Sequence, residues 1–489
     1  MIFRRNILLL FFLLISFSLK AQINVNTDTI FHIRQNNLFL QIPEKSLNAA
    51  GLVLGTNMGV WAFDRFISKD TFAYINSHTI KRNFKTGFAW DNDGFKTNLF
   101  LHPYHGGIYF NAARSNGMSF WQSVPFVAAG SLGWEFFMET EPPAINDFFA
   151  TTIGGTCLGE MNFRISDLII DDRTRGLERF GREALLTIVS PMRGITRMIN
   201  GQSGAHRTVR GNSLPLPQST FYLTTGHRFL SAKTPIDKDV SNMISYNLGL
   251  YYGNPFDEDN SKPYDFFILK EGGNINTAQP VISYINALGM LYSTGIHLKN
   301  PNRQLMIGFF QHYNFYFSKA EINHEELIPY KISEAASFGP GLMYKSKVKS
   351  DVDFSGSFHL SGILLGGSYT DHYKYANRDY NMGSGFSSKL NFELLIRNKV
   401  RFYLKSEHYR IYSWKGYDPS MADNVTHNVQ GDKGHATLSV VNLTFSYILK
   451  GHYLISTESG LFFRRSVYAY FPTVQNRAFE NKICVGYVF

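Results

Sequence analysis

The stretch Phe386-Ser-Ser-Lys-Leu-Asn-Phe-Glu-Leu-Leu-Ile396 alternates between apolar and polar side chains along most of its length. In a β-strand successive side chains point to opposite faces, so this stretch predicts a strand with one apolar and one polar face. The same alternation returns in residues 400–405, 441–449 and 482–489. A water-soluble sandwich would show the same period, so alternation by itself leaves the kind of sheet open.

The spacing of these segments favours a membrane barrel. Their connections alternate between short turns, such as 450–451, and longer polar stretches, such as 413–434. Outer-membrane barrels combine an even number of strands with short periplasmic turns and long outer loops. We therefore predict an outer-membrane β-barrel over residues 217–489, with both ends on the periplasmic side. The twelve candidate strands are 217–230, 241–253, 263–270, 286–298, 303–317, 332–346, 351–367, 386–396, 400–412, 435–449, 452–467 and 479–489.

Three histidines fall on the less apolar faces of these candidate strands. They are His297, His312 and His359. In a barrel with its apolar face turned to lipid, the other face lines the lumen. We therefore expect these three side chains to point into the lumen, solvated or hydrogen-bonded there.

The C-terminal residues support the barrel. The chain ends on aromatic Phe489, preceded by polar Lys482, small Cys484 and aromatic Tyr487. This ending resembles the terminal assembly signal of Gram-negative outer-membrane barrels, although that pattern usually has glycine where Cys484 stands. The resemblance implies the barrel-assembly machinery, acting on the C-terminal strand, and outer-membrane lipids as partners.

The N-terminus has the pattern of a secretory signal peptide. Arg4 and Arg5 precede the apolar run Ile7–Phe17, and the small residue Ala21 follows. This pattern predicts a signal peptide over residues 1–21, followed by a linker over residues 22–45. The remaining chain holds no run of about 20 predominantly apolar residues, the length that a spanning helix needs. A closed barrel is then the way for an exported chain to cross a bilayer.

The composition excludes several classes of protein. Hydrophobic residues make up 44% of the 489 residues, with 43 Phe and 27 Tyr, which excludes a disordered chain. The only cysteines are Cys157 and Cys484, so this is no disulfide scaffold, and we expect two free, buried thiols. The formal net charge of +10 is not gathered in a dense basic patch, which argues against nucleic acid as a partner.

The first half of the chain has a different period. Its apolar residues come in blocks of helical character up to about residue 216, which predicts a helical domain over residues 46–205. The predicted fold is therefore α+β, an antiparallel barrel preceded by helices that plug or cap its narrow lumen. Gly51, Gly55 and Gly59 share one helix face, which predicts close contact with another helix. The expected helices are 47–66, 119–138, 146–168, 175–189 and 191–200.

Polar and glycine-rich blocks are concentrated between residues 102 and 160. They are His102-Pro-Tyr-His105-Gly, Ala113-Arg-Ser-Asn-Gly117, and Asn146-Asp147 followed by Gly154-Gly155 and Gly159-Glu160. These blocks resemble an uncharacterised bacterial domain family of predicted outer-membrane proteins, over about residues 70–200. The family has no assigned activity. The resemblance therefore implies a location and an architecture and transfers no catalytic residue.

The default interpretation of these blocks is a structural network. Arg114 is expected to pair with Glu135 or Asp147, and Asn116 and Asn146 are further candidates for binding contacts. Buried polar groups need hydrogen-bond partners, and the lumens of membrane barrels are polar.

Two alternatives give the same residues a chemical role. A hydrolytic site would use His102 or His105 as general base, Asp147 or Glu160 to orient it, and Ser115 or water as nucleophile. No nucleophile-elbow glycine pattern surrounds Ser115, which counts against this site. A metal site would combine the two histidines with a carboxylate, a weak pattern without further ligands.

These patterns predict a plugged outer-membrane barrel of the Gram-negative cell envelope that is structural or handles a small ligand or lipid. An integral hydrolase of lipid or lipopolysaccharide acyl chains and a gated transporter remain alternatives, so enzymatic activity stays open. No cofactor or metal is predicted. Gly154-Gly155 is not a phosphate loop, since no Lys-Ser/Thr pair follows it. The helical domain is expected in the periplasm or inside the lumen.

Overall fold

The computed structural model describes residues 45–91, 93–232, 241–275, 279–320, 328–375, 378–421, 428–449 and 452–489. The predicted signal peptide and the linker up to residue 44 lie outside the described residues. The chain forms two compact units. Among the described residues, the helical unit comprises 45–81, 105–141 and 159–216, and the barrel unit comprises 82–104, 142–158 and those from 217 to 489.

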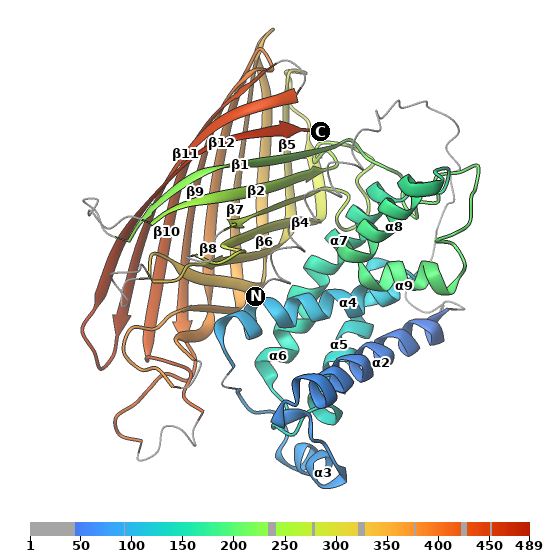
Figure 1. Ribbon diagram of the computed structural model, residues 1–489. Helices are drawn as coiled ribbons and strands as arrows, with labels where there is room; N and C mark the ends of the chain where they lie inside the picture. The colour runs from blue at the N-terminus through green and yellow to red at the C-terminus, as the bar shows by residue number, and fades with distance from the viewer. Residues whose placement is uncertain are drawn as a thin grey trace. The chain divides into compact units, whose positions relative to one another are not determined.

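The barrel unit contains a single closed antiparallel sheet (Figure 1). Twelve strands pair in sequence order, and β1 closes the sheet against β12, with Tyr222 opposite Val488. The prediction of about twelve antiparallel strands preceded by helices is confirmed. The strands are β1 (Ser219–Ser231), β2 (Ser241–Tyr252), β3 (Phe267–Asn274), β4 (Tyr284–Ile296), β5 (Arg303–Phe317), β6 (Lys331–Lys349), β7 (Val352–Tyr369), β8 (Tyr380–Ile396), β9 (Val400–Ser413), β10 (Gly434–Ile448), β11 (Tyr453–Tyr468) and β12 (Val474–Val488).

The two ends of this barrel differ in their connections. At one end, named here the short-turn end, β1 begins, β12 finishes, and residues 350–351 and 397–399 form tight connections. At the opposite, long-loop end most connections are longer, such as 370–379 and 414–433. Two connections depart from this pattern, since 253–266 at the short-turn end is long and 469–473 at the long-loop end is short. In outer-membrane barrels the short turns face the periplasm.

Apolar side chains on the strands point outward. Leu443 on β10 and Ile483 on β12 are 54% and 60% exposed. Their sequence neighbours Asn442 and Lys482 are buried and line the interior of the barrel. A soluble sheet would bury its apolar face, so the outward apolar face identifies an outer-membrane type of barrel.

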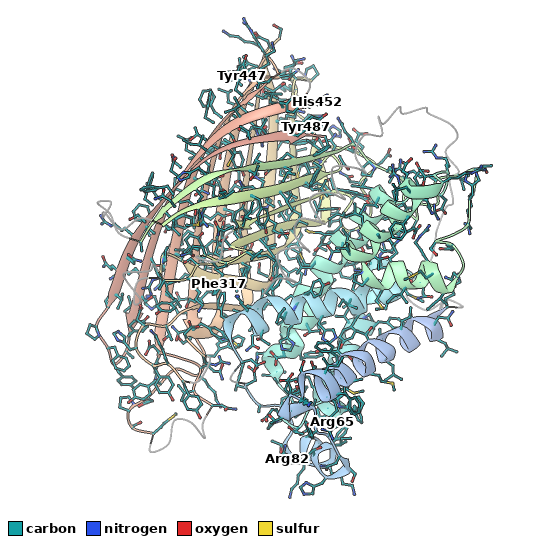
Figure 2. All side chains as sticks on the ribbon, viewed as in Figure 1. Arg65, Arg82, Phe317, Tyr447, His452 and Tyr487 are labelled. Atoms are coloured by element: carbon teal, nitrogen blue, oxygen red, sulfur yellow. The ribbon has the colours of Figure 1, made fainter. Side chains whose placement is uncertain are left out.

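Aromatic residues gather at the short-turn end. Tyr447, His452 and Tyr487 lie near one another there (Figure 2). The ring centroids of Tyr453 and Tyr487 are 5.3 Å apart, and Tyr453 is 59% exposed. Rings of exposed aromatic side chains typically mark the boundary between lipid and water in barrels of this kind.

Side chains of the strands themselves close the lumen. Inward-pointing apolar residues from nine of the twelve strands, together with Tyr330 just before β6, form one buried cluster, named here the closing layer. Within it the rings of Tyr330 and Phe462 stack with centroids 4.4 Å apart. Arg228 lies beside it, pairs with Glu480 of the neighbouring strand β12 at 2.9 Å, and also contacts the hydroxyl of Tyr330. The layer consists of Leu230, Met243, Tyr316, Tyr330, Ile332, Ile363, Tyr409, Ile411, Leu438, Val440, Phe462 and Ala478.

The helical segments of the barrel unit lie on the outer face of its wall. Phe95 packs against Phe315 at a centroid distance of 5.4 Å, and the Tyr313 hydroxyl donates to the carbonyl of Leu99 at 2.7 Å. Both β5 residues alternate with Asn314, whose side chain faces the lumen. The expectation of a plug is therefore corrected in one respect: neither 82–104 nor 142–158 enters the lumen. Wall side chains close the lumen at the closing layer, and these segments instead cover apolar residues on the outside.

The helical unit and the segments joined to it are built from short helices. Helix α5 begins with a capping box formed by Ser119 and Gln122. The serine hydroxyl accepts from the backbone N–H of Gln122 at 3.3 Å. Helices over 77–86 and 97–114 were not expected from the sequence. No helix among the described residues is both long and apolar enough to cross a bilayer. The helical elements are α2 (Ser46–Phe63), η1 (Asp64–Ser68), η2 (Thr71–Ala73), α3 (Ser77–Thr86), η3 (Thr97–Leu101), α4 (His102–Arg114), α5 (Phe120–Phe137), α6 (Ile145–Phe149), η4 (Ala150–Gly154), α7 (Gly155–Ile169), α8 (Gly176–Val189) and α9 (Pro191–Ile199).

The expected glycine contact face on α2 is wrong. A Cβ atom at Gly51, Gly55 or Gly59 would meet no described atom within 4 Å. The close contact lies instead at Gly130 on α5, where a Cβ would come within 2.8 Å of the Tyr109 ring. Spacing along one helix shows which residues share a face, and it does not show whether that face turns toward a neighbour.

Candidate functional site

Asp91 joins the two helical segments of the barrel unit to the loops of the barrel. Its Oδ1 accepts from the side-chain amides of Asn98 and Asn146, both at 2.8 Å, and lies 3.2 Å from Nη2 of Arg378. Its backbone carbonyl accepts from Gln430 at 2.9 Å. Sequence analysis missed Asp91, because nothing in its local pattern distinguishes it from a surface carboxylate.

The side chain of His102 lies beside the contacts of Asp91, and its imidazole ring is neutral. Its Nε2 lies 3.5 Å from Oδ1 of Asp147, and its Nδ1 lies 3.4 Å from the Thr151 hydroxyl. Burial lowers the pKa of His102 to about 4, against the opposing pull of the Asp91 carboxylate. Asn146 donates to the same Asp147 oxygen at 2.7 Å. A neutral ring with its proton on Nε2 satisfies both of its contacts.

This burial predicts a pH dependence of the packing. The folded pKa of His102 is about 4 and the unfolded value is 6.5, so the unfolded segment binds more protons between those values. The stability of the segment is therefore retained above pH 6.5 and falls as the pH decreases toward 4. Hydrogen exchange of residues 97–104 should quicken over that range in the natural chain. His102→Asn should remove this part of the pH dependence, and an equal pH response in both chains would contradict the assignment.

Gly154 lets the second segment approach the barrel wall closely. A Cβ atom there would lie 2.8 Å from the carbonyl oxygen of Ala335 and 3.0 Å from Pro103. Next to it, Gln311 on β5 donates from Nε2 to the carbonyl of Ile153 at 2.9 Å. The Gly154-Gly155 block thus acts in docking a helical segment onto β5 and β6.

The remaining predicted site residues lie in the helical unit, where Glu160 is the centre of a buried ion cluster. Arg114 contacts it through Nε at 2.7 Å and Nη2 at 3.0 Å, and Arg164 contacts it through Nε at 2.8 Å. The partner of Arg114 is therefore neither Glu135 nor Asp147. Helix α7 places Glu160 opposite α4, a pairing that depends on how the two helices pack. Two guanidinium groups fix this carboxylate as a structural anion.

The other residues considered for chemistry make local contacts. His105 packs its ring against Tyr109 and Trp134, with centroids 4.5 and 5.6 Å away. Asn116 donates to the carbonyl of Ala112 at 2.8 Å, and Glu135 is 1% exposed. The Ser115 hydroxyl has no hydrogen-bond partner among the described residues. Since a serine nucleophile needs a base within hydrogen-bond reach, this geometry does not favour a hydrolase.

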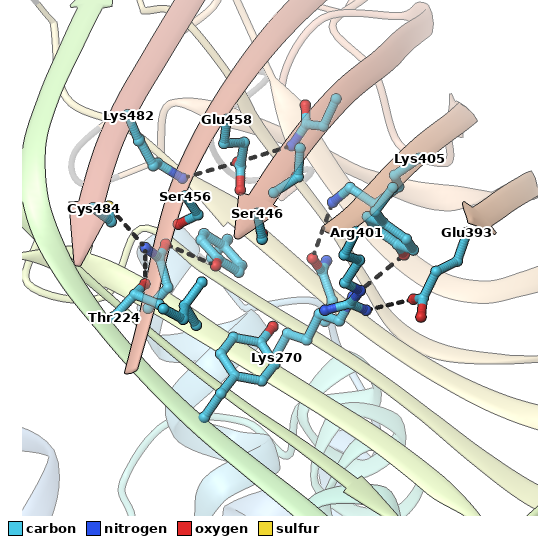
Figure 3. A pocket seen from close by; sticks show the side chains of 18 of the residues that line it. Thr224, Lys270, Glu393, Arg401, Lys405, Ser446, Ser456, Glu458, Lys482 and Cys484 are labelled. Carbon is cyan, nitrogen blue, oxygen red and sulfur yellow. Dashed lines mark hydrogen bonds and ion pairs between the residues drawn. The ribbon is translucent and has the colours of Figure 1, made fainter. Parts of the chain in front are cut away.

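The lumen holds a second candidate site, which sequence analysis did not single out. A cavity of about 400 Å³ lies between the closing layer, which forms its floor, and the short-turn end (Figure 3). Six tyrosines, four cations and three carboxylates are prominent in its wall. They are Tyr222, Tyr251, Tyr284, Tyr316, Tyr330, Tyr403, Lys270, Arg401, Lys405, Lys482, Glu393, Glu458 and Glu480.

Most charges in this cavity are paired. Arg401 contacts Glu393 through Nη2 at 2.5 Å, and Lys482 contacts Glu480 at 2.7 Å and Glu458 at 3.2 Å. These contacts tie neighbouring strands β8, β9, β11 and β12 together on their luminal side. Buried charges need such partners, so they keep the wall of the cavity in one arrangement.

Lys270 on β3 differs from the other three cations. Its Nζ contacts the Tyr403 hydroxyl at 3.3 Å and lies 4.3 Å from the centroid of the same ring. No described carboxylate lies within ion-pair distance of it. The cavity therefore contains one ammonium group held by aromatic and hydroxyl groups alone.

The comparisons with known proteins found one family model and several solved structures. Residues 87–192 match the family model described as a domain of unknown function, DUF3943, which confirms the resemblance found in the sequence. No curated protein matches the chain. Among solved structures, the NanC porin is similar at 11% identity and a TM-score of 0.28, over 54% of this chain and 98% of that one.

Two further solved structures are similar over slightly more than half of the chain. OmpT of Vibrio cholerae has 8% identity and a TM-score of 0.25, over 56% of this chain and 97% of its own. The COG4313 outer membrane channel of Pseudomonas putida F1 has 7% identity and a TM-score of 0.27, over 57% of this chain and 97% of its own.

Proposed function

We propose that this protein is an outer-membrane barrel that receives a small ligand in its lumen from the periplasmic side. The observation that carries the proposal is the cavity of about 400 Å³ that ends on the closing layer. Ligand sites are typically concave, partly apolar and of several hundred Å³, with a few convergent polar groups. An open pore would need a continuous aqueous lumen, and the closing layer interrupts it.

The motif residues have a different role in this proposal. Asn146 and Gly154 of these blocks, together with Asp91 outside them, hold helical segments on the outside of the wall, near the long-loop end. They do not line the cavity. We infer that the matched family domain supports the barrel wall, and that ligand chemistry resides in the barrel.

A natural reporter for access to the cavity is Cys484, which lines it on β12. Cys157 serves as an internal control, because burial raises its pKa to about 12 and keeps it a thiol. In the full chain in detergent, neutral methyl methanethiosulfonate should modify Cys484 about tenfold faster than Cys157. Peptide mass mapping distinguishes the two cysteines, and the Cys484→Ser variant should lose the fast phase. If Cys484 reacts only after denaturation, small molecules do not reach the cavity and the proposal is wrong.

A further inference from the structure

We infer that the ligand of the luminal cavity is a small organic anion, whose acidic group is held by Lys270. This inference rests on the proposed function and adds the chemical class of the ligand. It follows from three features of the barrel unit: an ammonium group without a carboxylate partner, a polar recess beside it, and a wall of tyrosine rings.

The first feature is the charge of Lys270. Each of the other cations in the cavity has a carboxylate within 4.0 Å, including Lys405, which lies 3.7 Å from Glu407. Lys270 has only the Tyr403 hydroxyl and the faces of Tyr403 and Tyr251, at 4.3 and 5.4 Å. An ammonium group inside a barrel gains most from an anion that enters the cavity, because no wall carboxylate competes for it.

The second feature is a recess next to Lys270. A smaller cavity of about 60 Å³ shares Lys270 and Lys405 with the main one, and His312 and His359 line it further in. Both histidines are 1% exposed. Nε2 of His312 and both ring nitrogens of His359 have no hydrogen-bond partner among the described residues. Three lysines, Lys270, Lys389 and Lys405, and one carboxylate, Glu407, line the recess. The positive charges outnumber the negative one, which favours an anion over a cation there.

The third feature is the aromatic wall. Tyr222, Tyr251 and Tyr284 line the cavity around Lys270, and the hydroxyl of Tyr251 accepts from Arg401 at 2.9 Å. Tyrosine rings give flat apolar surface, and their hydroxyl groups give hydrogen bonds at the edge. This surface fits the ring or short carbon skeleton of the same anion, such as an aromatic or alicyclic carboxylate.

The test compares thiol reagents that differ in charge, with Cys484 as the target. The anionic 2-sulfonatoethyl reagent should modify Cys484 about tenfold faster than the cationic 2-trimethylammonioethyl reagent, after each rate is divided by that of the neutral methyl reagent. Lys270→Gln should abolish this preference, and Lys270→Arg should keep it. The matched control is Lys345→Gln on β6, an exposed lysine outside the cavity, which should leave the preference unchanged.

A second arm of the experiment tests the ligand class directly. Benzoate should slow the neutral modification of Cys484, whereas benzamide, which has nearly the same shape without the charge, should slow it about tenfold less at equal concentration. Lys270→Gln should make the two probes equal.

The outcomes separate the two proposals. Fast neutral modification with no preference for the anionic reagent, or equal protection by benzamide, overturns the anion inference and leaves the luminal ligand site in place. Absence of neutral modification overturns the proposed function itself. A charge preference that survives in Lys270→Gln would assign the anion to other cations of the wall and overturn the role of Lys270.

Discussion

Replacing Gly154 with valine is expected to release residues 82–104 and 142–158 from the barrel wall. The first added carbon would lie 2.8 Å from the carbonyl oxygen of Ala335, which belongs to a strand and cannot move aside like a flexible side chain. Overpacking of this kind destabilises by about 1–3 kcal/mol, and here it also strains the adjacent bond from Gln311 to the carbonyl of Ile153. Hydrogen exchange should show loss of protection in both segments, while the heat-modifiable gel shift of the folded barrel remains.

The matched control is Gly181 on α8. A Cβ atom there meets no described atom within 4 Å, so Gly181→Val lacks the clash. That variant should keep the protection of both segments. If Gly154→Val keeps it as well, the segments do not depend on this close approach, and the docking role of the glycine block is wrong.

Removing two rings of the closing layer is expected to convert a closed barrel into a conducting one. Tyr330 and Phe462 stack across the floor of the cavity, and both belong to the cavity wall and to the closing layer. The double variant Tyr330→Ala, Phe462→Ala should carry steady ion current in planar bilayers, where the natural chain shows none. Each truncation of a buried aromatic side chain also costs about 3–5 kcal/mol, so a lower unfolding temperature should accompany the current.

An outward ring on the same strand provides the control. Phe463 on β11 is 39% exposed and points away from the lumen. The Phe463→Ala variant should carry no steady ion current in the planar bilayer. Steady current through the natural chain would show that the layer is open in the membrane, which contradicts a closed barrel. If the double variant carries no current, residues other than Tyr330 and Phe462 block the passage of ions through the lumen.

The buried polar contacts explain what the polar residues among residues 87–192 do in the fold: they hold segments in place. The polar residues that resemble a catalytic cluster form one set of contacts around Asp91 and another around Glu160. Carboxylates held by amides and guanidinium groups are suited to fixing segments in place. The hydrolase alternative would need an activated nucleophile, and Ser115 has no base bonded to it among the described residues.

The sequence by itself determined the barrel. A strand has a period of two, so alternation assigned each segment a face without knowledge of its neighbours. The lengths of the connections then ordered the strands as hairpins, and all twelve predicted segments overlap an observed strand. The same alternation placed Arg401 and Lys405 on polar faces, and it placed His312 and His359 correctly inside. His297 is the exception, since it follows the end of β4 and is exposed.

Only the tertiary structure decided which side chains meet. Asp91 and Arg378 lie 287 positions apart in the chain, and Lys270 and Tyr403 lie 133 apart. A β-bulge is also not visible in the alternation. The register of β6 shifts between Glu334 and Ala336, which changes which residues face the lumen beyond that point. The alternation of apolar and polar residues along a strand indicates which face of the sheet a side chain points to. The partner across the lumen depends on how the closed sheet staggers its strands, and that stagger is a property of the whole barrel.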